Sequence, residues 1–157
     1  MNAMSRKSRW VRLSLFFQVA LLAYYETIEW INIFPWNDIR AGNGQAILDW
    51  IVTGILIVLI GITFFRLWGA MIAAALLYGL WLWLQIDSWW IPYIQGASPG
   101  WTRVYGRFFS QTIKFLPSSG PHLAPDACHV VLQGLIVGAM LATLFGIFEV
   151  RRSRVLR

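Results

Sequence analysis

The chain has 157 residues, of which 58% are hydrophobic and 13% are charged, and that charged fraction is about half the average for a soluble domain. So large an apolar surplus exceeds what a soluble core of this size can bury. The ten Trp, ten Phe and five Tyr are typical of chains that meet membrane interfaces. The composition therefore predicts an integral membrane protein. The single cysteine, Cys128, excludes an intramolecular disulfide and a cysteine-based metal cluster.

Four apolar stretches have the roughly 20 residues that an α-helix needs to cross about 30 Å of hydrocarbon. They cover residues 13–34, 46–65, 68–90 and 127–148. The sequence predicts an all-α fold, with residues 1–157 forming a single transmembrane domain built as a four-helix bundle. The first stretch follows a basic segment, but it is longer than a signal-peptide core and lacks small residues at its end. We therefore expect a retained anchor.

Two glutamates, Glu26 and Glu29, lie late in the first stretch and share one face of a helix. Counted from the start of the stretch, they lie about 20 Å and 24 Å along it, in the outer half of a bilayer. A lone charge at the bilayer centre costs about 3 kcal/mol on insertion scales, and neighbouring carboxylates repel. At least one glutamate should therefore be protonated, paired or metal-bound. The structural alternative to a ligand is an ion pair with Arg103, Arg107 or Lys114.

Asp49 opens the second stretch and Asp87 closes the third. A carboxylate at a helix N-terminus satisfies free N–H groups and the helix dipole, which explains Asp49 without a function. Asp87 falls near the C-terminal end of its helix, where a negative charge opposes the dipole, so it requires a specific partner. In antiparallel helices both aspartates join Glu26 and Glu29 in one layer near one membrane face. Ionisable residues at such a depth are functional-site candidates by default.

The only long connection, residues 92–126, contains five of the six prolines. Within it, residues 101–116 place Trp101, Tyr105 and other apolar side chains on one helical face, and Arg103, Arg107 and Lys114 on another. The pattern predicts an amphipathic helix on the outer membrane surface. It would act either as an interfacial anchor or as a lid over a site.

Asp126 and His129 open the fourth stretch, where Asp126 is expected to cap the helix. The pair also faces Glu26 and Glu29 at a similar depth, and carboxylates with such a pair on facing helices are ingredients of di-metal sites. The sequence therefore leaves open a divalent metal site made of Glu26, Glu29, Asp126 and His129. Asp87 and Asp126, which flank the long loop, would instead suit an aspartyl dyad for intramembrane hydrolysis.

The fourth stretch also carries small residues at strict four-residue spacing, which we call the small-residue stripe. Its members are Gly134, Gly138, Ala142 and Gly146. Small residues at this period let another helix approach closely. The sequence does not decide between a partner helix in the same bundle and a homo- or hetero-oligomer.

Basic residues are divided unevenly between the two sides of the predicted bundle. One side carries nine of the thirteen and a single acid, Glu149: Arg6, Lys7, Arg9, Arg12, Arg66, Arg151, Arg152, Arg154 and Arg157. The other side carries four basic residues and six acids. The positive-inside rule predicts a multi-pass protein of the cell (inner) membrane with both termini cytoplasmic. This distribution follows topology, so the net charge of +6 does not indicate a nucleic-acid partner.

These features favour an outward-facing polar site that binds a cation, a metal or a polar lipid head group. The predicted core of that site is Glu26, Glu29, Asp87 and His129, with Arg103, Arg107 and Lys114 gating it or contacting phosphate. The site would serve transport or a lipid-directed membrane enzyme. The alternative is a non-catalytic subunit of a larger membrane complex, in which the acids pair with the loop cations and the small-residue stripe is an interface. Whether the protein is an enzyme stays open.

Reporter fusions test the predicted topology. Fusions at Arg66 and Arg154 should report the cytoplasm, and fusions at Gly42 and Ser118 the exterior, because the basic residues gather on the first side. A cytoplasmic signal from Ser118 would contradict the four-span arrangement and, with it, the shared layer of acids.

Overall fold

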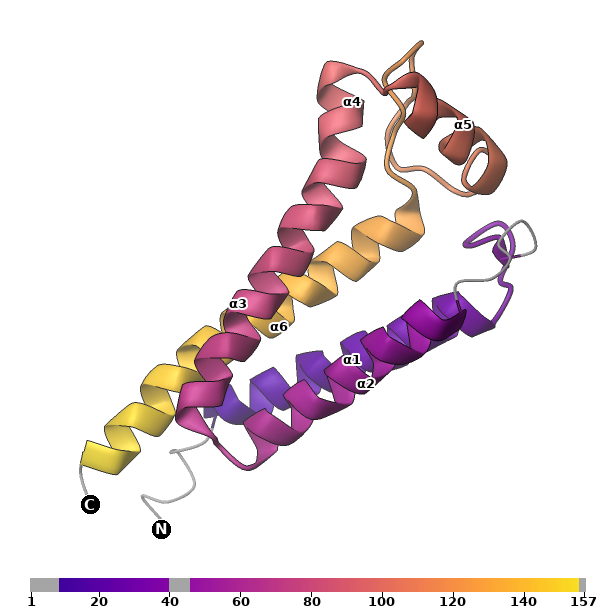
Figure 1. The fold of residues 1–157 in the computed structure, drawn as a ribbon. Helices are drawn as coiled ribbons and strands as arrows, with labels where there is room; N and C mark the ends of the chain where they lie inside the picture. Colours follow the sequence, from indigo (N-terminus) through magenta and orange to yellow (C-terminus); the bar gives the residue numbers. More distant parts are fainter. Residues whose placement is uncertain (1–8, 40–45, 156–157) are drawn as a thin grey trace.

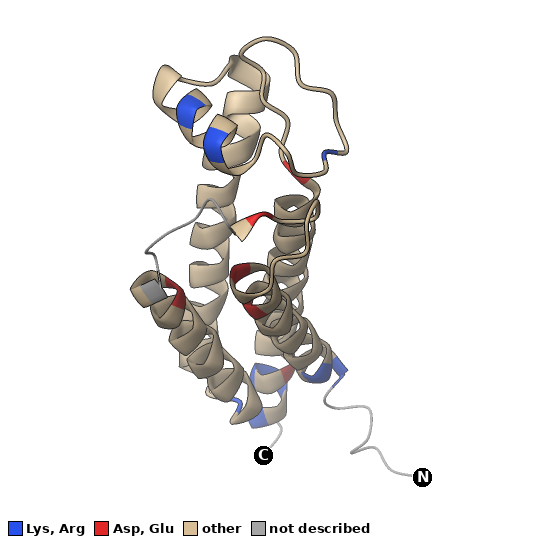
Figure 2. Ribbon diagram, turned by 90° about the vertical axis from the view of Figure 1, so that its right-hand side faces the viewer, with Lys and Arg blue, Asp and Glu red and all other residues tan. Residues whose placement is uncertain are grey.

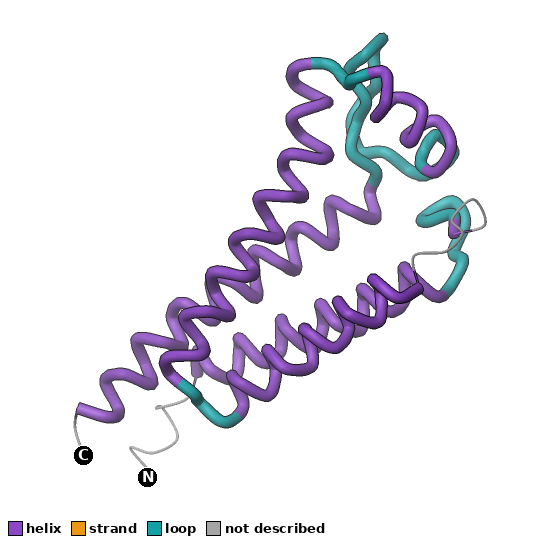
Figure 3. Tube along the Cα trace, viewed as in Figure 1, coloured by secondary structure: helices purple, strands orange, loops and turns teal. Residues whose placement is uncertain are grey.

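The computed structural model describes residues 9–39 and 46–155. Its elements in chain order are α1 (Arg9–Trp30), α2 (Ala46–Phe64), α3 (Trp68–Gln85), a π-helical turn η3 (Ile86–Trp90), α4 (Ile91–Gln95), α5 (Pro99–Phe108) and α6 (Ala127–Val155). No strand occurs in these ranges, as the purple and teal trace of Figure 3 shows. The predicted all-α fold is confirmed over this part of the chain. Arg6, Lys7, Arg40, Gly42 and Arg157 lie outside the described residues.

Four helices of the described ranges are long and apolar enough to cross a membrane: α1, α2, the continuous helix from α3 through α4, and α6. The start of α1 and the end of α6 lie at one end of the molecule, which we call the termini end, and the connection from α4 to α6 lies at the other, the loop end (Figure 1). Four such helices fit a multi-pass membrane protein. The helix limits differ from the predicted ones at the loop end, where α1 stops at Trp30 and the third helix continues to Gln95.

The helix α6 is the centre of the packing. The α1 helix packs along α6, α3 packs on the same helix, and α2 packs mainly against α1 and much less against α3. The α2 helix therefore lies at the edge, and only 22% of its span is buried, against 44% for α6. Large uncovered apolar surfaces are unusual in soluble monomers, so this exposure fits a lipid solvent.

At the termini end, Glu149 joins α6 to the first turn of α1. Its carboxylate accepts hydrogen bonds from the backbone N–H groups of Arg9, Trp10 and Val11 at 3.1, 3.1 and 3.2 Å. These N–H groups have no partner within their own helix, and a negative charge at this end also offsets the helix dipole. A side chain of the last helix thus holds the first described turn of α1.

A buried polar network connects three helices in the interior. The two N–H groups of the Gln18 amide in α1 are shared among the hydroxyls of Ser14, Thr63 and Thr143, which lie 3.1, 2.9 and 3.0 Å from the amide nitrogen, and all four side chains are fully buried. Ser14 and Thr143 are themselves 2.7 Å apart, and Thr143 donates to the Ala139 carbonyl at 2.7 Å. Side-chain hydrogen bonds between apolar helices hold such bundles together in the absence of a strong hydrophobic drive.

The small-residue stripe contacts neighbouring helices of the same chain. A Cβ atom added at Gly138 would lie 2.5 Å from a ring carbon of Phe17, closer than real contacts allow, and one at Gly146 would approach α3 at 3.3 Å. Ala142 is buried. At Gly134, in contrast, nothing lies within 4 Å. Most of the stripe therefore serves packing within the bundle.

This difference between two glycines gives a matched stability test. Gly138→Ala should lower the free energy of unfolding by about 1–2 kcal/mol, because displacing the Phe17 ring outweighs the gain of about 1 kcal/mol in helix propensity. Gly134→Ala, in open space on the same helix, should be neutral or stabilising. Thermal unfolding of both variants in detergent measures the effect. Equal melting temperatures would contradict the close α1–α6 contact.

Candidate functional site

Three carboxylates lie together where α1 ends and α2 begins; we call Glu26, Glu29 and Asp49 the carboxylate cluster. Glu26 accepts a short hydrogen bond from the Thr53 hydroxyl of α2. Asp49 accepts one from the Tyr25 hydroxyl at 3.4 Å. All three carboxylates lie within electrostatic range of the buried Tyr25 side chain. The antiparallel contact of α1 with α2 therefore brings acids from two helices to one place.

Glu29 is the member of the cluster with the least local compensation. It lies in the last turn of α1, because that helix ends at Trp30, and a negative charge at a helix C-terminus opposes the dipole. Its charged neighbours are Asp49, Glu26 and the His129 ring. Glu29 is half-buried, and no ion pair or hydrogen bond to its carboxylate occurs among the described residues. It is therefore a poorly compensated carboxylate.

The early end of α1 follows from a single side chain. The Asn37 amide nitrogen donates to the Ile28 and Ile31 carbonyls at 2.7 and 2.8 Å, and its oxygen accepts from the Ile33 N–H at 2.7 Å. These bonds satisfy carbonyls that would otherwise lack partners at the helix end. The chain consequently turns four residues before the predicted limit, and Glu29 comes close to the end of the bundle.

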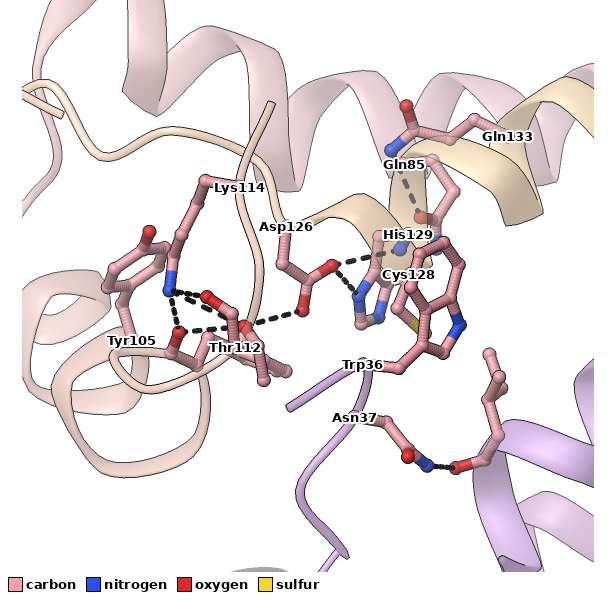
Figure 4. Close-up of polar contacts among 12 residues, drawn as sticks. Trp36, Asn37, Gln85, Tyr105, Thr112, Lys114, Asp126, Cys128, His129 and Gln133 are labelled. Carbon is pink, nitrogen blue, oxygen red and sulfur yellow. Dashed lines mark hydrogen bonds and ion pairs between the residues drawn. The ribbon is translucent and has the colours of Figure 1, made fainter. Parts of the chain in front are cut away.

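Asp126 and His129 form a second polar group at the start of α6 (Figure 4). One Asp126 oxygen accepts from the His129 backbone N–H at 2.9 Å and lies 2.7 Å from the His129 Nδ1 atom. The other oxygen accepts from the Thr112 hydroxyl at 3.3 Å. The Asp126 side chain is 2% exposed and that of His129 21%. Asp126 thus caps the helix as expected, and it also orients the imidazole with its Nε2 atom facing away from the carboxylate.

The imidazole is packed among aromatic rings from the other elements of the loop end. Its ring centroid lies 4.2 Å from that of Trp89 in η3 and 5.4 Å from that of Phe109. Trp89 in turn contacts the rings of Trp101 and Tyr105 of α5 at 5.5 and 6.5 Å. We call these five residues the loop-end aromatic cluster. The packed rings hold the plane of the His129 imidazole, and the contact with Asp126 determines which edge of the imidazole faces the carboxylate.

Lys114 binds backbone carbonyls instead of a carboxylate (Figure 4). Its ammonium donates to the carbonyl of Phe109 in a short contact, and to those of Ser110 and Thr112 at 3.0 and 2.7 Å. Burial lowers the pKa of Lys114 from its usual value, and the negative charge of Asp126 opposes that shift. The lysine therefore secures the turn after α5. This turn also ends the helix at Phe108, short of the predicted limit at residue 116.

The other predicted loop cations are also not paired with the acids. Arg103 and Arg107 are exposed on α5, and Arg107 lies over the Phe108 ring at 4.9 Å. Within residues 9–39 and 46–155 neither forms an ion pair. Asp87 is exposed in η3, eight residues before its continuous helix ends. It does not close the helix, so the predicted conflict with the dipole is absent, and it is not a charged neighbour of Glu29.

The structure joins some predicted ligands and separates others. Asp126 lies against His129, and Glu26 and Glu29 lie beside Asp49, with His129 within electrostatic range of Glu29. Across the described ranges, however, no three His, Cys, Asp or Glu side chains come close enough together to hold a metal ion. A metal bound here would need side chains of both groups to move toward one another.

Two contributors to the site went unnoticed in the sequence. Thr53 lies one turn after Asp49 on α2, a spacing that signals a shared face, and it binds Glu26. Trp89 is buried against His129, but it is one of ten Trp residues and carries no distinguishing signal. The chain matches no protein-family model, no curated protein and no solved structure.

The Asp126–His129 arrangement gives a stability prediction. Asp126→Ala should lower the free energy of unfolding by about 1–3 kcal/mol, because the α6 cap and the buried partner of Thr112 are lost together. Asp126→Asn keeps an acceptor oxygen for the cap and should cost less than half as much. Thermal unfolding in detergent measures both. Similar losses in the two variants would contradict the capping role.

Proposed function

We propose that the loop end binds a cationic ligand, either a metal ion or the ammonium group of a polar lipid head group. The site consists of the carboxylate cluster together with His129. Such a site would serve transport or a lipid-directed membrane enzyme. The observation that carries the proposal is that none of the three carboxylates forms an ion pair with a lysine or arginine of the described chain.

Electrostatics favours a cation at this position. Half-buried acids that repel one another are stabilised when a positive charge binds among them, and Glu29 also lies beside the negative end of the α1 dipole. The His129 ring, held by Asp126, presents a nitrogen lone pair or a proton at the edge of the same region. Carboxylate oxygens and a neutral imidazole are common ligands of divalent metals.

The contacts of Lys114 weigh against the subunit alternative. In that alternative the acids are structural and pair with the loop cations. Lys114 instead binds three carbonyls, and Arg103 and Arg107 are exposed on α5. The loop cations that the subunit alternative requires as ion-pair partners therefore do not pair with the acids. Asp87, exposed in η3, is left out of the proposed site and becomes a useful control.

Neutralising Glu29 tests the proposal. Purified protein is titrated with Mn²⁺, Ca²⁺ or a phosphatidylethanolamine head-group analogue while its melting temperature is recorded. A ligand at 100 times its Kd stabilises the folded protein by about 2.7 kcal/mol. Glu29→Gln should keep or raise the melting temperature without ligand, because repulsion is relieved, and should abolish the ligand-induced rise.

Two matched variants make the result specific. Asp49→Asn should behave like Glu29→Gln, whereas Asp87→Asn removes one loop-end charge outside the cluster and should leave the ligand-induced rise unchanged. A lower melting temperature in Glu29→Gln with an intact response to ligand would contradict the site. It would leave the subunit interpretation standing.

A further inference from the structure

The helix α5 has an exposed basic face. Arg103 and Arg107 are both exposed and lie four residues apart, about 6 Å along the axis on one side of the helix. The Ser98 hydroxyl accepts from the Trp101 N–H at 3.2 Å and caps the helix start. Lys114 binds the carbonyls just beyond its end. A ten-residue helix capped at both ends is a defined platform for two guanidinium groups.

The opposite face of α5 is packed on the protein itself. Tyr105 is 6% exposed, and its hydroxyl donates to the Ala124 carbonyl at 2.8 Å. Trp101 contacts Trp89 with 5.5 Å between ring centroids. Trp101 and Tyr105 of the predicted apolar stripe thus pack on the end of the bundle. The basic positions are on the exposed side of the helix, and Figure 2 colours these turns of α5 blue.

The surroundings of the two arginines suit a phosphate in a membrane surface. No carboxylate pairs with either one in the described ranges, and a planar guanidinium binds phosphate oxygens through two parallel hydrogen bonds. Apolar side chains around α5 are also exposed, among them Ile94, Val104 and Phe115. With the four long helices crossing a bilayer, α5 lies beside α4 and past the loop-end limits of α1, α2 and α6 (Figure 1), where the lipid head groups begin.

We propose that Arg103 and Arg107 bind the phosphate groups of anionic phospholipids in the leaflet at the loop end. Basic residues at a membrane surface attract anionic lipids, and nearby apolar side chains contact the upper acyl region. This surface binds an anion on the outside of α5, whereas the carboxylate cluster binds a cation at α1 and α2. The two proposals rest on different residues and can fail separately.

Photo-crosslinking at Val104, the exposed residue beside Arg103, tests this directly. The full chain with p-benzoylphenylalanine at position 104 is placed in nanodiscs of phosphatidylcholine with or without phosphatidylglycerol. We expect preferential crosslinking to phosphatidylglycerol. At limiting phosphatidylglycerol, the yield of the phosphatidylglycerol crosslink should fall about 25-fold in Arg103→Gln/Arg107→Gln, because each basic residue contributes roughly fivefold. Arg103→Lys/Arg107→Lys should retain most of the charge-dependent preference.

The outcomes separate the possible occupants. Equal yields with both lipids, or an unchanged yield in the glutamine double variant, would overturn the proposal. Loss of the crosslink on adding free glycerol phosphate would show a site for a soluble anion and would overturn it as well. The double variant should keep its melting temperature and its response to Mn²⁺, so a failure here is distinct from failure of the cation site.

Discussion

The contact between α1 and α6 is the interaction on which the rest of the structure depends. At the termini end the Glu149 carboxylate caps the first turn of α1. In the middle of the contact, the Phe17 ring packs closely against Gly138. At the loop end the Tyr24 hydroxyl donates to the Cys128 carbonyl at 2.9 Å. Fixed at three levels, the two helices hold Glu29 at the end of α1 within electrostatic range of His129 at the start of α6.

The polar groups inside this contact have different tasks along its length. The Gln18 network binds hydroxyls of α1, α2 and α6 to one another and so brings α2, otherwise an edge helix, into a fixed position. Each such hydrogen bond is worth on the order of 0.6–2 kcal/mol in a membrane. The position of α2 in turn determines where Asp49 meets Tyr25 and where Thr53 meets Glu26. The carboxylate cluster therefore depends on the Gln18 network, which holds α2 in place.

The sequence predicted the parts of the fold that depend on length and composition. Four long apolar helices, and the position of the acids other than Glu149 in one half of the molecule, follow from patterns that any lipid-facing bundle must satisfy. Helix ends depend on individual side chains instead. Asn37 ends α1 early, and Lys114 secures the turn that ends α5. Sequence periodicity does not predict the role of either residue, because each one binds backbone carbonyls that come within hydrogen-bond distance only in the folded loop.

The candidate site was predictable only in part, for the same physical reason. Asp126 and His129 are three residues apart on one helix, so their contact follows from local geometry. The closeness of Asp49 to Glu29 also follows, since consecutive membrane-crossing helices are antiparallel and these two residues lie on either side of the connection between them. The partners of the loop cations cannot be predicted from the sequence. Whether a basic side chain binds a carboxylate, a carbonyl or solvent depends on distances in the folded structure.

At the loop end, the basic side chains and the carboxylates are held apart from one another. Lys114 turns inward to backbone carbonyls, Arg103 and Arg107 are exposed on α5, and the carboxylates lie half-buried between α1 and α2 (Figure 2). Opposite charges that could neutralise one another within the chain are instead held on different elements. The aromatic packing of Trp89 against α5 and His129 keeps them apart, because it fixes α5 with its basic face directed outward. Each set of charges is thereby available to a partner of opposite sign from outside the chain; we propose a cation for the acids and the phosphates of a membrane surface for the arginines.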